Sequence, residues 1–102
     1  FNKIMFVKIH NSYRMVIAIC DSELVGKKFE EDIKQLDVRE SFYKGEEMEE
    51  KELVELLIDM AKEDATFSIV GKQAVNCALK AGIISKEGIK KISGVPYALV
   101  LL

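Results

Sequence analysis

Alternating hydrophobic and polar positions near the start of the chain predict a β-strand. Met5, Val7 and Ile9 occupy every second position, so their side chains lie on one face of an extended segment. A turn is predicted at residues 11–12, because asparagine and serine favour turns. The uninterrupted apolar run at residues 15–20 is typical of a central strand covered on both faces. We therefore expect these two strands to form a hairpin.

The next segment predicts a short helical turn followed by a third strand. The aspartate and serine at residues 21–22 are suited to cap a turn over residues 23–25, which stops at Gly26. Hydrophobic side chains then alternate with polar ones over residues 36–43. This alternation favours a half-exposed strand that ends at residues 44–45.

Helical periodicity occurs twice in the second half of the chain. The first helix is predicted over residues 49–63, and its apolar stripe consists of Leu53, Leu56, Leu57, Met60 and Ala61. The second is predicted over residues 72–81. It ends at Gly82, because glycine readily adopts the left-handed conformation that closes a helix. Ser85 is suited to begin a short third helix.

The last hydrophobic segment, residues 95–102, predicts a closing strand. Pro96, the only proline, lies at its start, where a missing backbone N–H costs least. This order of strands and helices favours an α+β fold over a regular alternation of strand and helix. We expect one domain over residues 1–102, with a small, mostly antiparallel sheet of about four strands packed with two main helices.

Composition places the chain among globular proteins of modest size. It has 102 residues, of which 49% are hydrophobic and 31% charged, with a net charge of −2. This length supports one core but no separate cofactor-binding domain, and no cofactor is expected. The longest apolar run is too short to cross a bilayer, and residues 1–3 do not open a signal-type hydrophobic segment. No membrane association is expected.

The two cysteines are expected to be buried free thiols in a reducing, cytoplasmic compartment. Cys20 and Cys77 lie far apart within apolar segments, which is neither a disulfide framework nor a zinc pattern. His10, the only histidine, is the one imidazole base available to a Cys20 nucleophile across the predicted hairpin. A buried cysteine and an exposed histidine at a strand end are the favoured interpretation. The sequence therefore favours a protein without catalytic residues.

Charge is divided into three blocks along the chain. Residues 1–28 carry five basic and two acidic side chains, a net charge of +3. Residues 29–66 carry five basic and fourteen acidic side chains, −9, and residues 67–102 carry five basic and one acidic, +4. If the two ends meet in space, they form a basic patch on an acidic protein. The acidic residues at the start of the helix predicted over residues 49–63 favour its dipole, so we interpret them as a solvated face and expect no metal.

A Val-Gly-Lys segment occurs twice, ending at Lys27 and at Lys72. In the second copy Gly71 directly precedes the predicted helix. Free N–H groups at a helix N-terminus, together with an adjacent lysine, suit an anion such as phosphate. The segment is not a Walker motif and Gly-Lys pairs are frequent, so a turn glycine followed by a solvated lysine is the alternative interpretation.

A further basic group lies near the carboxyl end of the chain. Lys86, Lys90 and Lys91 come shortly before Tyr97. Lysines beside an aromatic ring can hold a nucleic-acid backbone while a base stacks on the ring. The alternative interpretation is an ordinary solvated face.

Short segments spread along the chain form an ordered set. They lie at residues 7–10, 17–30, 36–38, 42–46, 69–75, 81–84 and 94–98. Together they resemble an archaeal family, the domain of unknown function numbered 424, over nearly the whole chain. Ser68 and Tyr97 depart from the pattern, which has asparagine and histidine there. The resemblance implies a small archaeal cytosolic α+β protein without an established activity, for which a link to translation or RNA is a hypothesis.

These features favour a non-enzymatic binding module for RNA or a ribonucleoprotein. The candidate binding residues are one turn glycine, six lysines that could contact phosphates, and two tyrosines on which bases could stack. They are Lys27, Lys28, Tyr43, Lys44, Gly71, Lys72, Lys90, Lys91 and Tyr97. One alternative is a protein–protein adaptor that binds a basic partner through the acidic segment 46–64. A less favoured alternative is an enzyme that binds a small phosphorylated ligand at Gly71-Lys72.

Overall fold

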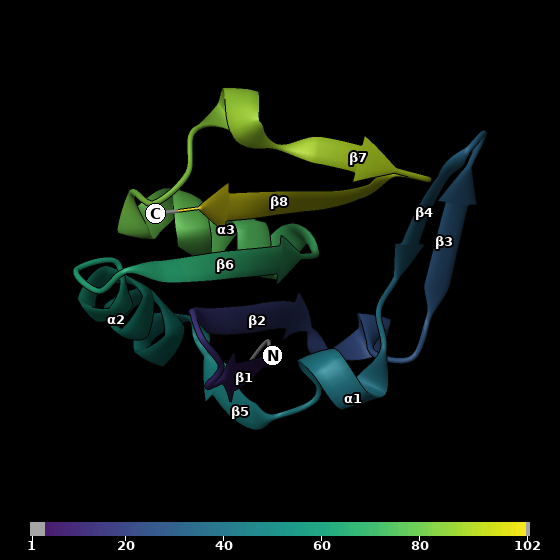
Figure 1. Ribbon diagram of the computed structural model, residues 1–102. Helices are drawn as coiled ribbons and strands as arrows, with labels where there is room; N and C mark the ends of the chain where they lie inside the picture. The colour runs from purple at the N-terminus through teal and green to yellow at the C-terminus, as the bar shows by residue number, and fades with distance from the viewer. Residues whose placement is uncertain (1–3, 102) are drawn as a thin grey trace.

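A six-stranded mixed sheet organises the part of the chain that the structure describes, residues 4–101 (Figure 1). The structure is a computed structural model. From one edge to the other, the strands are β5 (Glu46–Glu49), β1 (Ile4–His10), β2 (Met15–Asp21), β6 (Ala65–Val70), β8 (Val95–Leu101) and β7 (Lys90–Ile92). The sequence-based boundaries that involve residues 1–3 and residue 102 lie outside the described residues.

The N-terminal hairpin is confirmed, and next to it lies the one parallel strand pair of the described sheet. β1 pairs with β2 in antiparallel register, with Val7 opposite Ile19. β2 pairs with β6 in parallel, whereas the other neighbouring strands run antiparallel. Residues 17–20 of β2 are all buried, as the continuous apolar sequence of this strand predicts, and Asp21 is buried as well.

Two helices, α2 (Glu50–Met60) and α3 (Lys72–Ala81), lie over the same face of the sheet (Figure 1). The main core between sheet and helices includes Met5, Ile17, Ile19, Leu53, Leu57, Phe67 and Ile69. α3 has the predicted bounds and ends at Gly82, whose φ of 78° is left-handed. The helix predicted over residues 49–63 is confirmed as α2, although it ends at Met60. None of the described helices is long and apolar enough to cross a membrane.

The third strand predicted over residues 36–43 is only partly correct. The chain instead forms a separate hairpin of β3 (Lys28–Glu31) and β4 (Lys34–Asp37), followed by a single turn of helix, α1 (Glu40–Tyr43). Val38 and Phe42 are four residues apart, a spacing that fits both the period of a strand and one turn of helix. The sequence pattern could not separate these two structures.

Both edge strands were missed by the sequence analysis, which expected about four strands. β5 and β7 are four and three residues long, and their exposed side chains are Glu46, Glu47 and Glu49 in β5 and Lys90 and Lys91 in β7. Such short segments carry little hydrophobic alternation, and charged edges are typical of natural sheets. The α+β class, the mostly antiparallel pairing and the two main helices are confirmed.

Two 3₁₀ turns stand where short helical segments were predicted. η1 (Ser22–Leu24) follows β2, and η2 (Lys86–Gly88) follows Ser85. Neither turn has a side-chain hydrogen bond at its N-cap, so Asp21 and Ser85 do not form the capping hydrogen bonds predicted for them. The carboxylate of Asp21 binds another helix instead, as described below.

The face of the sheet opposite α2 and α3 is only partly covered. A second, smaller apolar cluster lies there, with Ala18, Cys20, Val38, Tyr43 and Val70 buried in it. Phe29 and Leu36, which are opposite one another in the β3–β4 hairpin, pack against this cluster. Figure 1 shows the hairpin standing beyond one end of the sheet, with its tip close to the turn between β7 and β8. The rest of this face lies open.

Replacing Gly71 by alanine should destabilise the protein more than the same change at Gly26. Both glycines have positive φ, 107° and 85°, so a side chain costs about 1–2 kcal/mol at either position. At Gly71 a Cβ would also lie 2.4 Å from the Cγ of buried Asp21, whereas at Gly26 nothing lies within 4 Å.

In urea unfolding, we expect the free energy of unfolding to fall by about 1 kcal/mol for Gly26→Ala and by about 3 kcal/mol or more for Gly71→Ala. Equal losses for the two variants would contradict the close packing of Gly71 on Asp21.

Candidate functional site

Strand register determines which side chains share the uncovered face of the sheet. Tyr97 in β8 lies directly opposite Lys90 in β7 and opposite Val70 in β6. Directly opposite residues place their side chains on the same face, close enough to interact. Tyr97 packs against the smaller apolar cluster with Val70, so Lys90 projects from that face as well. The structure therefore brings together two of the predicted binding residues.

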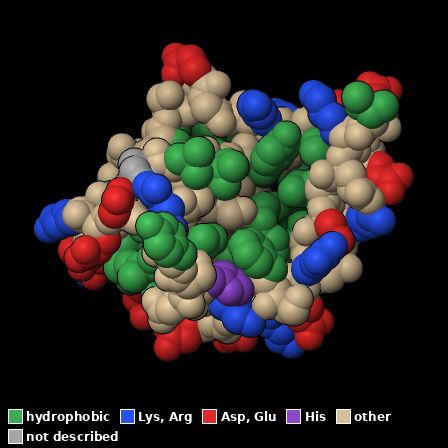
Figure 2. All heavy atoms as spheres, viewed as in Figure 1, with side chains coloured by type: hydrophobic (Ala, Val, Ile, Leu, Met, Phe, Trp, Pro, Cys, Tyr) green, Lys and Arg blue, Asp and Glu red, His purple; other side chains and the backbone are tan. Residues whose placement is uncertain are grey.

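Two leucines continue this surface along β8. Leu99 and Leu101 are 65% and 71% exposed and alternate with buried Ala98 and partly buried Val100, so they share the face of Tyr97. We call the surface formed by Lys90, Tyr97, Leu99 and Leu101 the open face. Figure 2 shows hydrophobic side chains gathered across the middle of this side of the molecule and a hollow beside them. Basic and acidic side chains are interspersed around the rim (Figure 2).

Tyr43, the other tyrosine predicted to stack, lies in the interior. Its side chain is 6% exposed, and its hydroxyl forms a 2.8 Å hydrogen bond with the Oγ of Ser68. Burial raises the pKa of the Tyr43 phenol, although the hydrogen bond to Ser68 lowers it. A ring in this position is inaccessible to a nucleic-acid base. Of the two candidate tyrosines, Tyr97 is the one that reaches the open face.

Polar contacts hold α1 against the sheet. The Nζ of Lys8 donates to the carbonyl oxygen of Ser41 at 2.7 Å, and the Nε2 of His10 lies 2.9 Å from the carbonyl oxygen of Phe42. The rings of His10 and Phe42 are stacked, with their centroids 4.5 Å apart. Because a carbonyl oxygen can only accept, the Nε2 of His10 carries the proton. His10 is therefore a structural residue in this arrangement.

The geometry does not support a nucleophile pair of Cys20 and His10. Cys20 lies opposite Phe6, four residues before His10 on β1, which corresponds to about 13 Å along the strand. Burial, with smaller effects from two nearby carboxylates, raises the pKa of the Cys20 thiol to about 12. The thiol is therefore protonated at neutral pH. The predicted burial of Cys20 is confirmed, but His10 is half-buried and not exposed as the sequence led us to expect.

The carboxyl ends of β2 and β6 meet at the start of α3, where a buried carboxylate joins them. Asp21, the last residue of β2, is 3% exposed. Its two carboxylate oxygens accept hydrogen bonds from the backbone N–H groups of Gln73 at 3.1 Å and Ala74 at 2.8 Å. These N–H groups belong to the first turn of α3 and have no partner within the helix. The negative charge also interacts favourably with the helix dipole.

A pocket of about 330 Å³ opens beside this junction, between η1, the start of α3 and the β7–β8 turn. Its lining includes Asp21, Glu23, Lys72 and Gln73. Asp21 already occupies two of the amides that a phosphate at Gly71-Lys72 would need. An anion in the pocket would also lie near the carboxylate of Glu23. The arrangement disfavours a phosphate ligand here.

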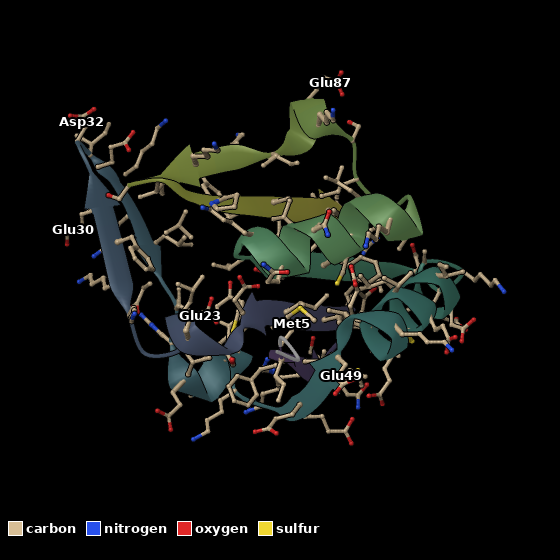
Figure 3. The ribbon with its side chains drawn as sticks, turned by 180° about the vertical axis from the view of Figure 1, so that it is seen from behind. Met5, Glu23, Glu30, Asp32, Glu49 and Glu87 are labelled. Atoms are coloured by element: carbon tan, nitrogen blue, oxygen red, sulfur yellow. The ribbon has the colours of Figure 1, made fainter. Side chains whose placement is uncertain are left out.

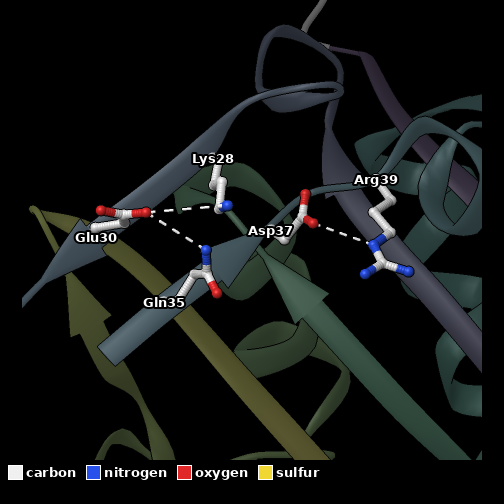
Figure 4. Close-up of polar contacts among 5 residues, drawn as sticks. All are labelled: Lys28, Glu30, Gln35, Asp37 and Arg39. Carbon is white, nitrogen blue, oxygen red and sulfur yellow. Dashed lines mark hydrogen bonds and ion pairs between the residues drawn. The ribbon is translucent and has the colours of Figure 1, made fainter. Parts of the chain in front are cut away.

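The remaining candidate lysines are spread over the surface. The Nζ of Lys28 lies 4.0 Å from the Oε1 of Glu30 on the outer face of the hairpin (Figure 4). The Nζ of Lys44 lies 3.8 Å from the Oε1 of Glu40 in α1. Lys27 is exposed at the base of the hairpin. Exposed ion pairs of this kind contribute only about 0.2–1 kcal/mol, so they leave the lysines able to exchange partners.

The basic residues of β1 and of the β1–β2 turn lie apart from those of β7. β1 is separated from β8 by β2 and β6, so the N-terminal strand lies far from β7. Arg14, one of the N-terminal basic residues, pairs at 3.2 Å with Asp64 beyond the end of α2. Lys91 lies opposite Pro96 and so projects to the other side of β7 from Lys90.

The sequence did not identify the exposed Leu99 and Leu101 or the β3–β4 hairpin as parts of a functional surface. One signal for the leucines was present, because residues 95–101 are apolar at nearly every position and not at alternate ones. Such a strand has two hydrophobic faces, and only one of them is needed against α3. Which face remained open depended on the number of helices available to cover the sheet.

The fold defines a small α+β protein whose mixed sheet is covered by two helices on one face and left partly open on the other. The chain belongs to the family described as "Protein of unknown function (DUF424)", which it matches over residues 10–102. Its structure is similar to that of an uncharacterized conserved protein from Methanopyrus kandleri, with a TM-score of 0.82 and 23% identity over 96% of this chain and 92% of that chain. At this identity the likeness shows a shared fold. No match was found among curated proteins.

Both cysteines should resist alkylation in the folded protein. Cys20 and Cys77 are free and buried, and burial raises their pKa values from 9.0 to about 12 and about 11. We expect iodoacetamide to label neither residue at about pH 8 without denaturant and both in denaturant, as measured by mass spectrometry. Rapid labelling of Cys20 in the native protein would instead indicate an activated nucleophile.

The same shifts predict a loss of stability at alkaline pH. In the unfolded chain the two thiols ionise near pH 9.0, whereas in the folded protein they stay protonated to higher pH. The contribution of these cysteines to the free energy of unfolding is therefore fully present below pH 9.0 and is lost toward pH 11–12. A Cys20→Ala, Cys77→Ala variant should show a weaker decline in its free energy of unfolding over this range. A decline identical to that of the parent protein would contradict the prediction.

Proposed function

We propose that this protein is a non-enzymatic binding module for single-stranded RNA, free or within a ribonucleoprotein, that uses the open face of its sheet. The observation that carries the proposal is the pair of Lys90 and Tyr97 on adjacent strands. A base can stack on the tyrosine ring while the ammonium group neutralises a neighbouring phosphate, as in sequence-tolerant single-strand binding proteins. Leu99 and Leu101 extend the apolar surface on which the next bases would lie.

The distribution of charge favours a single strand over a duplex. Duplex binding without base contacts depends on many phosphate contacts, each of which needs a basic side chain. The protein has a net charge of −2, and the strand order separates the basic side chains of β1 from those of β7. Stacking on an open apolar face requires fewer cations, since every base presents a π-face.

Replacing Tyr97 or Lys90 by alanine should weaken binding to a labelled single-stranded RNA. Loss of the ring removes a stacking contact worth about 1–3 kcal/mol, so Tyr97→Ala should raise Kd by about 5- to 150-fold. Lys90→Ala should reduce the slope of log Kd against log salt concentration by about 0.7, the value for one phosphate contact on a single strand. Fluorescence anisotropy across a salt series measures both quantities.

Two matched control variants show whether binding is lost because the open face is changed or because any lysine or tyrosine is removed. Tyr13→Ala removes a fully exposed tyrosine in the β1–β2 turn, and Lys62→Ala removes an exposed lysine just beyond the end of α2. Both variants should bind RNA as the parent protein does. If Tyr13→Ala weakens binding as much as Tyr97→Ala, the open face is not the binding surface.

A second candidate function, a protein–protein adaptor, is favoured by the acidic edge of the sheet. β5 is an edge strand with Glu46, Glu47 and Glu49 exposed. This strand leads directly into α2, which continues the acidic surface along segment 46–64. Its partner would be a basic protein that meets this edge. Glu50 already bonds Lys80, so it is the least available of these carboxylates.

Charge reversal at the β5 edge tests the adaptor function. Tagged protein and a Glu46→Lys, Glu47→Lys, Glu49→Lys variant should be compared in capture from an archaeal lysate treated with ribonuclease. An adaptor would retain specific basic proteins after ribonuclease and lose them in the variant, because like charges then face each other. Equal capture by both proteins would rule out this role for the edge.

A further inference from the structure

The β3–β4 hairpin ends in an acidic tip that is attached to the turn beside the proposed RNA site. Glu30, Glu31 and Asp32 form this tip, and Figure 3 shows Asp32 at its far end. The Oε1 of Glu31 accepts a hydrogen bond from the backbone N–H of Ser93 at 2.8 Å. The Oγ of Ser93 donates to the carbonyl oxygen of Glu30 at 2.7 Å. Ser93 directly follows β7, the strand that carries Lys90.

The two ends of the hairpin are held very differently. Its base is fixed, because Val38 is fully buried and exchanges backbone hydrogen bonds with Gly26 at 2.7 Å and Lys27 at 2.9 Å. Along its length, Phe29 and Leu36 pack on the smaller apolar cluster but remain half-buried. The tip contacts at Ser93 are exposed to solvent. Exposed hydrogen bonds with little apolar burial open most easily, so the tip is the end expected to detach.

The tip also places negative charge beside the lysines of β7. β3 and β4 both lie against β7. The carboxylate at β7 is that of Glu31, which bonds the amide of Ser93, whereas Glu30 lies near Lys28 on the outer face of the hairpin. The charge of Glu31 acts on nearby cations over about one Debye length, which is ~10 Å at 0.1 M salt. Neither lysine of β7 has an ion-pair partner among residues 4–101. Glu31 thus places a negative charge next to β7 without pairing directly with either lysine.

We propose that the acidic tip is a built-in competitor of RNA, which must be displaced from β7 before an RNA strand occupies the open face. This inference rests on the proposed RNA-binding function and adds its regulation. Phosphates replace Glu31 as the anion beside β7, the contacts at Ser93 open, and the hairpin turns about its fixed base at Val38. The hollow beside the open face then accommodates the strand (Figure 2).

Neutralising the tip tests this competition. The tip variant is Glu30→Gln, Glu31→Gln, Asp32→Asn. Asparagine tolerates the positive φ of 56° at position 32, so the turn should be preserved. The control variant is Glu46→Gln, Glu47→Gln, Glu49→Gln, which changes the net charge equally at β5, the opposite edge of the sheet. The probe is a labelled single-stranded RNA of about twelve nucleotides, a length within the range of known binding sites.

At low salt the tip variant should bind this RNA on the order of tenfold more tightly than the parent protein, and the control variant less than about twofold more tightly. The advantage of the tip variant should shrink as salt screens the carboxylates. If parent, tip and control proteins bind with equal affinity, the competition is refuted while RNA binding stands. If none of the three binds RNA, the proposed function fails and this inference fails with it.

Hydrogen exchange gives a second, direct measurement on the parent protein. The Ser93 amide donates to Glu31, so its exchange rate reports whether the tip is attached. Saturating RNA should accelerate exchange at Ser93 and leave the central strands β2 and β6 protected. Unchanged or slower exchange at Ser93 in the RNA-bound protein would overturn the displacement.

Discussion

The hydrogen bonds from α3 to the carboxylate of Asp21 are the interaction on which the rest of the structure depends. A buried carboxylate without partners is strongly unfavourable, and so are the unpaired amides of a buried helix start, so each group requires the other. The contact fixes the end of β2 to the beginning of α3 and thereby sets β2 beside β6 in parallel. Gly71 makes it sterically feasible, because any side chain there would overlap the carboxylate. The surfaces at this end of the sheet, including η1 and the β7–β8 turn, are arranged around that junction.

The open face follows from how few elements are available to cover the sheet. Six strands present two broad faces, whereas α2 and α3 lie on one of them. On the other face, a single turn of helix and a hairpin cover Ala18, Cys20 and Val70 but leave Leu99 and Leu101 exposed. Exposed apolar surface of this kind is characteristic of interaction sites. The asymmetry of coverage, more than any one motif, is what distinguishes the two sides of this molecule.

The sequence predicted those elements whose signals are local. α3 was placed correctly because helical periodicity is bounded by Gly71 and Gly82, and β2 because its apolar run is continuous. The β3–β4 hairpin and the edge strands were missed, since short polar strands lack alternation. The role of Asp21 was missed for another reason: its partners lie more than fifty residues away in sequence. For the candidate site, Lys90 and Tyr97 were identified, but strand register was needed to pair them, and the burial of Tyr43 depended on the unforeseen turn of α1.

The opposite charges of the two sheet edges have a consequence for symmetric self-association. A two-fold axis that joined two copies through β5 would set glutamates against glutamates, and one through β7 would set lysines against lysines. Like charges directly opposite one another across paired strands are destabilising. The exposed backbone of either edge is therefore prevented from recruiting its own counterpart, even though neither edge is covered by another element of the sheet. The protein can thus keep an uncovered hydrophobic face at high concentration without its sheet growing by two-fold pairing.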